Sequence, residues 1–170
     1  MSGTDPARLE PQPAAREWLS AFESALGRGD AAAAAACLLP DGHWRDLLSA
    51  TWRIETASGR PAIEALFGRT IEGFGARALR VAPARTPPRW VHRAGRDVLE
   101  LMFDFETAAG AGAGVARLVP DAGGPGGVRA WILLTSLQSL RGHEEASNAC
   151  GSQGKDYYNR DFGAENWEDK

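Results

Sequence analysis

The chain has 170 residues, of which 44% are hydrophobic and 24% charged, and its formal net charge is -3. This length suits one domain with a sizeable core, and the charge balance excludes a strongly basic nucleic-acid binder and a disordered acidic protein. Residues 1–18 lack the apolar segment of a signal peptide, and no run reaches the roughly 18–20 apolar residues of a membrane span, so we expect a cytoplasmic protein without membrane or nucleic-acid partners.

The chain begins with a stretch rich in proline and small residues, and residues 1–13 are expected to be a flexible lead. A helix is predicted over residues 14–30, because Trp18, Phe22 and Leu26 recur every four positions on one face.

A second helix is predicted over residues 31–39, where an alanine run gives the highest intrinsic helix propensity. Asp30 is placed to cap its first turn. Pro40, followed by Asp41 and Gly42, is expected to end it in a turn.

Two short extended segments come next. Residues 43–49 place Trp44, Asp46 and Leu48 on one face of a strand. Residues 51–56 continue with a second strand that contains Trp52.

A third helix is expected over residues 57–75. Ser58 is a plausible N-cap, and Pro61 suits the first turn. Its inner face is formed by large apolar residues, namely Ile63, Leu66, Phe67 and Ile71.

The rest of the domain is predicted to be strands. Pro87 and Pro88 interrupt residues 76–93, which favours an edge strand or a bent one. Residues 96–108 alternate apolar and polar side chains, as a half-buried antiparallel strand does. The glycine-rich residues 110–114 are expected to turn the chain into the next strand.

A second glycine-rich loop, residues 121–127, leads to a last long strand over residues 128–140. That strand is apolar on both faces, which is typical of a central strand. Helices first and strands after predict an α+β domain over residues 14–141, with helices on one face of a curved antiparallel sheet. The polar and aromatic tail, residues 142–170, is expected to lie extended on a surface of this chain or of a partner.

Motifs for cofactors and metals are absent from the sequence. The glycines at 110, 112 and 114 do not fit the GxGxxG dinucleotide fingerprint, and the three histidines have no metal-ligand spacing. Cys37 and Cys150 form no CxxC pair and are expected to be unbridged thiols. We therefore expect no metal and no cofactor bound by this chain itself.

Six arginines and no acidic residue lie between Gly73 and Asp97. They fit a solvated, protected sheet edge. They also fit a docking face for an acidic partner surface or for the acidic tail.

Asp46 is the candidate catalytic residue. If it faces the cavity between helices and sheet, burial would raise its pKa and make it a usable general base. Alternatively it pairs with Arg45, Arg53 or Arg60 and stabilises the fold. Other possible donors in the cavity are His43, Tyr157 and Tyr158. The residues expected to line the cavity are large and apolar, namely Trp18, Phe22, Trp44, Leu48, Trp52, Phe67, Phe103 and Trp131.

The element order and residues 41–67, "DGHWRDLLSATWRIETASGRPAIEALF", resemble the NTF2-like superfamily, which includes SnoaL-like polyketide cyclases and ketosteroid isomerases. The resemblance covers roughly residues 14–140 and implies a cone of curved sheet against three helices. It places Asp46 at the position of the isomerases' catalytic aspartate, with Asp104 as a possible second acid. The first helix carries Trp18 and Phe22 where those isomerases use a tyrosine.

Four stretches, the first of them within residues 41–67, resemble the N-terminal region of bacterial and fungal flavin-containing monooxygenases: "GHWRDLLSATWRIETASGR", "FDFETAAGAGAGVARLVPD", "LLTSLQSLRGHEE" and "RDFGAENWEDK". In that group FAD- and NADPH-binding domains follow, so both cofactors are implied only for domains absent from this chain. The resemblance implies an accessory domain that docks on a flavoprotein body or shapes its substrate access. The alternative is a free-standing isomerase, cyclase, hydrolase or ligand binder that takes a small apolar molecule into the cone. A homodimer is a third possibility.

Overall fold

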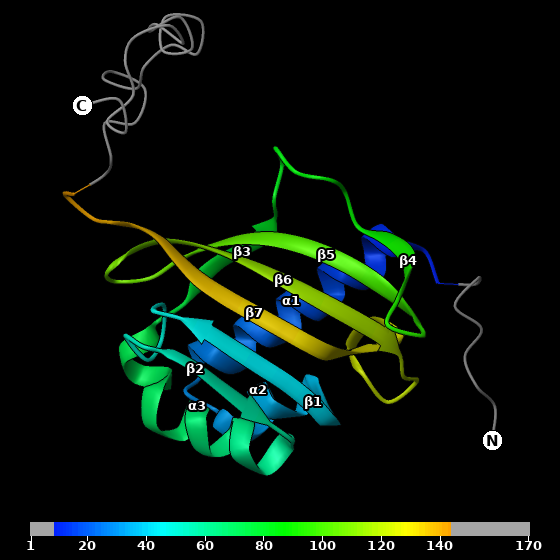
Figure 1. The fold of residues 1–170 in the computed structure, drawn as a ribbon, viewed down its shortest axis with the longest axis horizontal. Helices are drawn as coiled ribbons and strands as arrows, with labels where there is room; N and C mark the ends of the chain where they lie inside the picture. The colour runs from blue at the N-terminus through cyan, green and yellow to red at the C-terminus, as the bar shows by residue number, and fades with distance from the viewer. Residues whose placement is uncertain (1–8, 144–170) are drawn as a thin grey trace, which may run out of the picture.

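The computed structural model describes residues 9–143, which form three α-helices, a short 3-10 helix and seven strands (Figure 1). In chain order these are α1 (Pro11–Gly27), α2 (Ala31–Ala36), β1 (Leu38–Leu47), β2 (Ile54–Ser58), α3 (Arg60–Phe74), β3 (Arg77–Val81), β4 (Arg89–Arg93), β5 (Arg96–Glu106), β6 (Gly110–Pro120), η2 (Pro125–Gly127) and β7 (Val128–Leu140). The α+β class is confirmed. The first eight residues of the expected lead and residues 144–170 of the expected tail lie outside the described residues.

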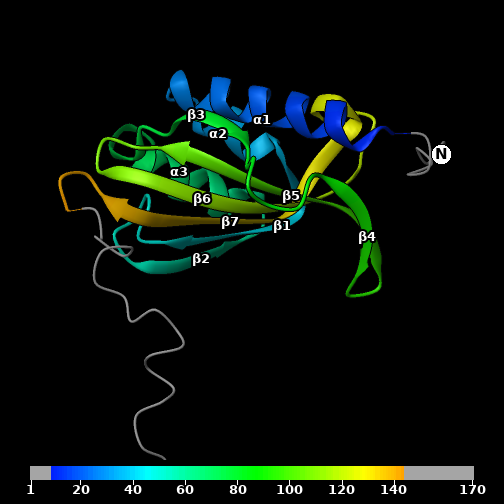
Figure 2. The same cartoon turned by 90° about the horizontal axis from the view of Figure 1, so that it is seen from above.

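The seven strands form one sheet in the order β2-β1-β7-β6-β5-β3, and β4 also pairs with β5. The helices lie on one face of this sheet, as expected, and leave the other face uncovered by helices (Figure 2). β7 lies between β1 and β6, which confirms it as a central strand. The sheet is not wholly antiparallel, because β7 pairs with β1 in parallel while pairing with β6 in antiparallel.

The first helix begins at Pro11, three residues earlier than expected. Proline is favoured in a first helical turn, where its missing N–H costs nothing. Residues 11–13 therefore belong to the helix and not to a flexible lead. The apolar stripe is confirmed, since Trp18, Phe22 and Leu26 are all buried.

Asp30 caps α2 as predicted, because the backbone N–H of Ala33 donates to Asp30 Oδ1 at 2.9 Å. The turn expected at residues 40–42 is wrong. These residues belong to β1, where the pairing with β7 shifts register between Leu38 and His43. Such a bulge tolerates a proline inside a strand.

The third helix confirms Pro61 in its first turn and buries its expected inner face. Ser58 does not cap it. Ser58 is the last residue of β2 and its hydroxyl lies 2.9 Å from His43 Nδ1, while Gly59 occupies the cap position without a side-chain hydrogen bond.

The glycine-rich residues 110–114 are strand and not turn, contrary to expectation. The turn is made by Thr107, whose Oγ1 accepts the backbone N–H groups of Ala109 and Gly110 at 3.1 Å each. A Cβ atom at Gly112 would overlap the Phe105 ring, and one at Gly114 would overlap the Phe103 ring. The glycines are therefore needed to let two aromatic rings lie flat over β6.

Aromatic rings fill the space between helices and sheet. Trp44 stacks on Phe67 with 4.1 Å between ring centroids, and Trp18 stacks on Phe22 at 5.1 Å. Each of these four side chains is exposed by 1% or less. The region predicted as a cone interior is thus a packed core at these residues.

Candidate functional site

Asp46 lies on β1 with its side chain fully buried. Three hydroxyl groups and two backbone amides donate to its carboxylate. Thr135 Oγ1, Thr51 Oγ1 and the Thr51 amide each do so at 2.8 Å, the Ala50 amide does so at 3.1 Å, and Ser49 Oγ is the fifth donor. No arginine pairs with this carboxylate among the described residues.

The hydrogen bonds reverse the pKa shift expected for Asp46. Burial by itself raises the pKa of the carboxyl group, but the hydrogen bonds from Ser49, Thr51 and Thr135 outweigh burial and hold the pKa below its ordinary value. The expectation of a raised pKa is therefore wrong. The buried, fully hydrogen-bonded carboxylate is a weak base with its lone pairs already engaged.

The donors come mainly from the 48–53 loop, which joins β1 to β2. Leu48 and Trp52 both adopt left-handed backbone conformations, with φ of 69° and 57°. Such conformations cost non-glycine residues roughly 1–3 kcal/mol and persist only where the surroundings enforce them. Here the Leu48 amide donates to the Arg53 carbonyl at 3.0 Å, and residues 49–51 between them donate to Asp46.

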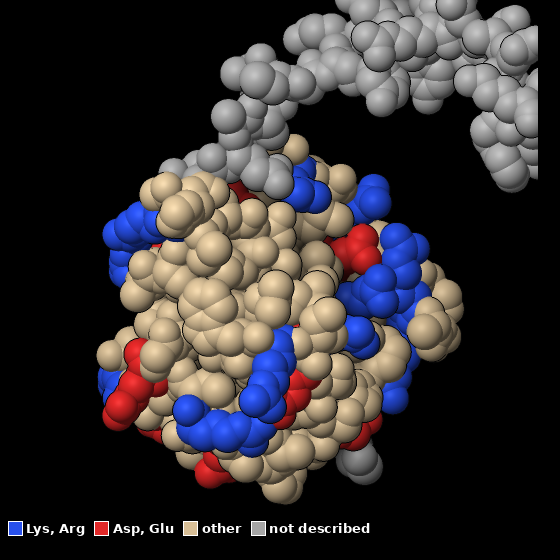
Figure 3. Space-filling model, turned by 60° about the vertical axis from the view of Figure 1, so that its left-hand side comes forward, with Lys and Arg blue, Asp and Glu red and all other residues tan. Residues whose placement is uncertain are grey.

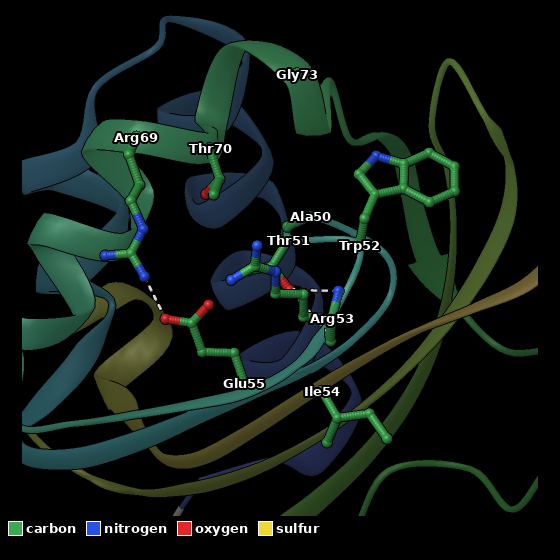
Figure 4. A pocket seen from close by; sticks show the side chains of 9 residues that line it. All are labelled: Ala50, Thr51, Trp52, Arg53, Ile54, Glu55, Arg69, Thr70 and Gly73. Carbon is green, nitrogen blue, oxygen red and sulfur yellow. Dashed lines mark hydrogen bonds and ion pairs between the residues drawn. The ribbon is translucent and has the colours of Figure 1, made fainter.

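A pocket of about 650 Å³ lies between this loop and the second half of α3, and we call it the mouth pocket (Figure 4). The pocket residues come from the loop, the start of β2 and α3, namely Ala50, Thr51, Trp52, Arg53, Ile54, Glu55, Arg69, Thr70 and Gly73. Ala50 and Thr51 both line the pocket and donate to Asp46. Asp46 thus lies behind the pocket wall and is not one of the lining residues.

The mouth pocket contains two arginines and one carboxylate. Arg69 on α3 forms an ion pair with Glu55 on β2. The Arg53 guanidinium has no hydrogen-bond or ion-pair partner within residues 9–143, and Figure 4 shows it pointing to the side of the pocket where Glu55 and Arg69 lie. The indole of Trp52 points the other way and is 59% exposed.

The surface at this end of the molecule is mixed in charge. Figure 3 brings the left-hand end of Figure 1 forward, and side chains of both signs surround a broad uncharged area there. Large hydrophobic side chains are exposed at this end, because Leu48 and Ile54 flank the same loop and are 45% and 67% exposed.

The residues predicted to line one cavity do not lie together in the structure. Trp18, Phe22, Trp44, Phe67 and Phe103 are buried in the core between helices and sheet. Trp52 lines the mouth pocket.

Leu48 and Trp131 leave the face on which they were expected. Leu48 lies beyond the last residue of β1, and its left-handed backbone turns its side chain out of the strand alternation into solvent. Trp131 lies at a register shift in β7, half-buried, with the Arg96 guanidinium 4.7 Å above its ring.

The sequence analysis did not identify Arg69, Glu55 and Thr70 as site residues. They come from β2 and α3, and nothing in their spacing along the chain indicates that they share a pocket. The Trp52-Arg53 pair would have been a signal had residues 51–53 been predicted as a connecting loop, where binding residues are common, but they were predicted as a strand.

The remaining candidates have local roles. His43 contacts Ser58, and His92 contacts Asp97 at 2.8 Å. Within the described part of the chain no three His, Cys, Asp or Glu side chains gather as metal ligands would. Cys37 is a free buried thiol, and burial raises its pKa to about 11. Cys150, Tyr157 and Tyr158 lie outside the described residues.

The arginine-rich segment is partly neutralised by the chain itself. Arg77 pairs with Glu106 at 3.6 Å, Arg93 with Glu100 at 3.4 Å and Arg96 with Asp41 at 3.7 Å. The prolines at 87 and 88 split the expected strand into β3 and β4, which both pair with β5 at the edge of the sheet. These pairings favour the protected-edge interpretation. Over residues 9–143 no helix has the length and apolar character needed to cross a membrane.

Comparisons with known proteins identify solved structures that share the fold. No protein-family model and no curated protein sequence matches the chain. A ketosteroid isomerase-like protein from Erwinia carotovora atroseptica is similar in structure, with 20% identity and a TM-score of 0.56 over 76% of this chain and 98% of that one. A putative calcium/calmodulin dependent protein kinase II association domain from Xanthomonas campestris shares 16% identity, with a TM-score of 0.51 over 81% of this chain and 97% of that one.

A protein of unknown function with a cystatin-like fold from Nostoc punctiforme also has a TM-score of 0.51, at 16% identity, over 74% of this chain and 90% of that one. Likenesses at such identities define the fold and carry no activity to this chain. The α+β fold expected from the sequence, a curved sheet packed against three helices, is thus confirmed, and these solved structures share it.

Proposed function

We propose that this domain binds a small organic molecule in the mouth pocket and does no chemistry on it through Asp46. The observation that carries the proposal is a pocket of about 650 Å³ whose wall, Ala50 and Thr51, is fixed from behind by a buried carboxylate. This volume lies within the range of roughly 300–1,000 Å³ typical of small-molecule sites.

The shape of the pocket supports binding because it is held in place before a ligand arrives. Four hydrogen bonds from residues 49–51 to Asp46 and the Leu48–Arg53 backbone bond hold the 48–53 loop against the strain at Leu48 and Trp52, and Thr135 on β7 fixes the carboxylate itself. A preformed site avoids the free-energy cost of ordering a loop on binding. The exposed Trp52 offers a large flat surface that loses little side-chain entropy on contact.

Isomerase, cyclase or hydrolase chemistry with Asp46 as base gains no support from this geometry. A general base must reach the proton that it abstracts, within hydrogen-bond distance or through one water. Asp46 is fully buried, and Ala50 and Thr51 stand between it and the mouth pocket. The geometry supports a positioning role for Asp46.

Two matched glycine substitutions test the binding proposal. Gly73 lines the pocket and a Cβ atom there meets no atom within 4 Å, so Gly73→Phe should fill part of the pocket space with its ring. Gly68 is equally open on the same helix but does not line the pocket, so Gly68→Phe is the control. Fragment screening by amide NMR shifts should give hits at residues 50–55 and 69–73 that Gly73→Phe abolishes and Gly68→Phe keeps. Hits that cluster elsewhere, or survive Gly73→Phe, would disprove the proposal.

We also propose that this domain docks on a flavoprotein body, as the resemblance to flavin monooxygenases implies. It is favoured by exposed apolar side chains at one end of the sheet, Leu48, Trp52 and Ile54, because solvent-exposed groups of this kind commonly mark contact surfaces. Mixing the chain with a candidate FAD-binding domain should give a yellow complex on size-exclusion chromatography. The double variant Trp52→Ser/Ile54→Ser should lose that complex, and a complex that it retains would exclude this surface.

A further inference from the structure

We infer that the mouth pocket selects an organic acid, with Arg53 binding the carboxylate of the ligand and Glu55 acting as its competitor. This inference rests on the proposed binding function and adds the ligand class. The polar groups of the pocket that already have hydrogen-bond or ion-pair partners indicate which groups remain for a ligand.

The hydroxyl groups of the pocket cannot donate to a ligand in this structure. Thr70 Oγ1 donates to the Leu66 carbonyl at 2.8 Å, and Thr51 Oγ1 donates to Asp46 at 2.8 Å. A hydroxyl has one proton, so both groups can only accept further hydrogen bonds. The side-chain donors left for a ligand are therefore the arginines and the indole N–H of Trp52.

The two arginines differ in availability. Arg69 already shares its charge with Glu55, whereas the Arg53 guanidinium has no partner within residues 9–143. The nearby Asp46 carboxylate cannot serve Arg53, because five other donors engage it. A planar guanidinium with free N–H groups matches the geometry of a carboxylate and forms charge-assisted hydrogen bonds with it.

Trp52 indicates the shape of the rest of the ligand. Its indole lies on the opposite side of the pocket from the Arg53 guanidinium (Figure 4). A ligand that reaches both therefore combines a carboxylate at one end with a flat apolar body at the other. Aromatic acids have this shape.

Glu55 should oppose Arg53 in the binding of acids. Its carboxylate lies on the same side of the pocket as Arg53 and occupies Arg69, so it repels an incoming anion and uses a donor that the anion needs. Removing the charge of Glu55 should strengthen the binding of acids. In the Glu55–Arg69 pair Arg69 is 57% exposed and Glu55 is 34% exposed, and surface ion pairs contribute little to stability, so the substitution should leave the fold intact.

The test uses matched acid and amide probes: benzoate with benzamide, 2-naphthoate with 2-naphthamide, and indole-3-acetate with indole-3-acetamide. Isothermal titration should show at least one acid binding about tenfold tighter than its amide, the size expected for one charge-assisted hydrogen bond. Arg53→Gln should remove this difference by weakening only the acid. Arg89→Gln removes the same charge from exposed β4, outside the pocket, and should change nothing. Glu55→Gln should tighten acid binding severalfold.

The outcomes separate the two claims. An amide that binds as tightly as its acid in the pocket overturns the organic-acid inference and leaves the binding function standing. Loss of acid binding in Arg89→Gln as large as in Arg53→Gln also overturns the inference, because the effect would then be one of net charge. If neither member of any pair binds and fragment screening gives no hits at the pocket, the binding function fails as well.

Discussion

The side chain of Asp46 accepts hydrogen bonds from three hydroxyl groups and two backbone amides, and four of the five donors belong to residues 49–51. The fifth donor, Thr135, also accepts the indole N–H of Trp44 at 2.9 Å. One carboxylate therefore connects the 48–53 loop, β7 and the aromatic core. Its place on the inner face of β1 could be predicted from strand alternation. Its partners could not, since Thr135 lies 89 positions away in the sequence.

Replacing Asp46 should destabilise the protein strongly. Asp46→Ala removes the acceptor of the buried Ser49 and Thr135 hydroxyl groups and of the Ala50 and Thr51 amides, and we expect a loss of about 3 kcal/mol in the free energy of unfolding. Urea denaturation followed by circular dichroism measures it. Asp104→Ala is the matched control, because Asp104 lies half-buried on the helix-free face of the sheet, and it should cost much less. Equal losses in both variants would refute the role assigned to Asp46.

Stability should also depend on pH through Asp46. Its pKa in the folded protein lies below the ordinary value of about 3.9 for the unfolded chain. The unfolded state therefore takes up a proton first as the pH falls. The contribution of Asp46 is complete above the unfolded pKa and is lost as the pH falls through the folded pKa.

Comparison of wild type with Asp46→Asn isolates this effect. The difference in unfolding free energy between the two should be constant from pH 7 to about pH 5 and should shrink below about pH 4. Urea titrations at a series of pH values measure it. A difference that grows on acidification would mean that the folded pKa is raised.

At the scale of the element, β6 shows why a glycine-rich segment was mistaken for a turn. Its glycines alternate with alanines over residues 110–114, a composition typical of loops. In the structure Gly112 pairs with Phe105 and Gly114 pairs with Phe103 across the antiparallel ladder. Two aromatic residues spaced by two, near two glycines spaced by two, were the available signal. The register that joins them follows from the length of the turn, which the sequence left undefined.

Gly114→Ala should therefore be costly although it adds a single methyl group. The new Cβ would overlap the Phe103 ring, and overpacking of this kind costs about 1–3 kcal/mol. Thermal or chemical unfolding measures the change. Phe103→Leu in the same chain should recover part of the loss, and this double-mutant cycle separates the clash from a loss of backbone freedom. Ala111→Val on the exposed face of the same strand is the control.

At the scale of the whole molecule, the helices cover only one face of the sheet (Figure 2). Met102, Val115 and Leu134 are register partners on the other face, where they line a shallow pocket of about 230 Å³. The α+β class, the order of the elements and the central position of β7 could be predicted from periodicity and turn residues. The parallel pairing of β1 with β7 could not, because it joins segments about 90 residues apart with no local signature.

We expect this uncovered face to pair with a second copy of the chain. Half-buried apolar side chains in the middle of a sheet face gain free energy when a partner removes them from water. Multi-angle light scattering should show a dimer, and Val115→Lys should shift it to monomer. Ala62→Lys on the exposed side of α3 is the control and should remain dimeric. A monomeric wild type at micromolar concentration would rule out a stable homodimer.

The hydrogen bond from Thr135 to Asp46 also bears on when the mouth pocket can form during synthesis. The residues that line it, 50–55, 69, 70 and 73, leave the ribosome well before β7 does. The carboxylate that holds the strained loop lacks one of its donors, and β1 lacks its central neighbour, until residues 128–140 have emerged. Non-local pairing of this kind is slow to form, because a long chain segment must close first. The pocket wall is therefore complete only after β7 has emerged, and a chain stalled before β7 would hold Leu48 and Trp52 by the hydrogen bonds within residues 46–53 but without the one from Thr135.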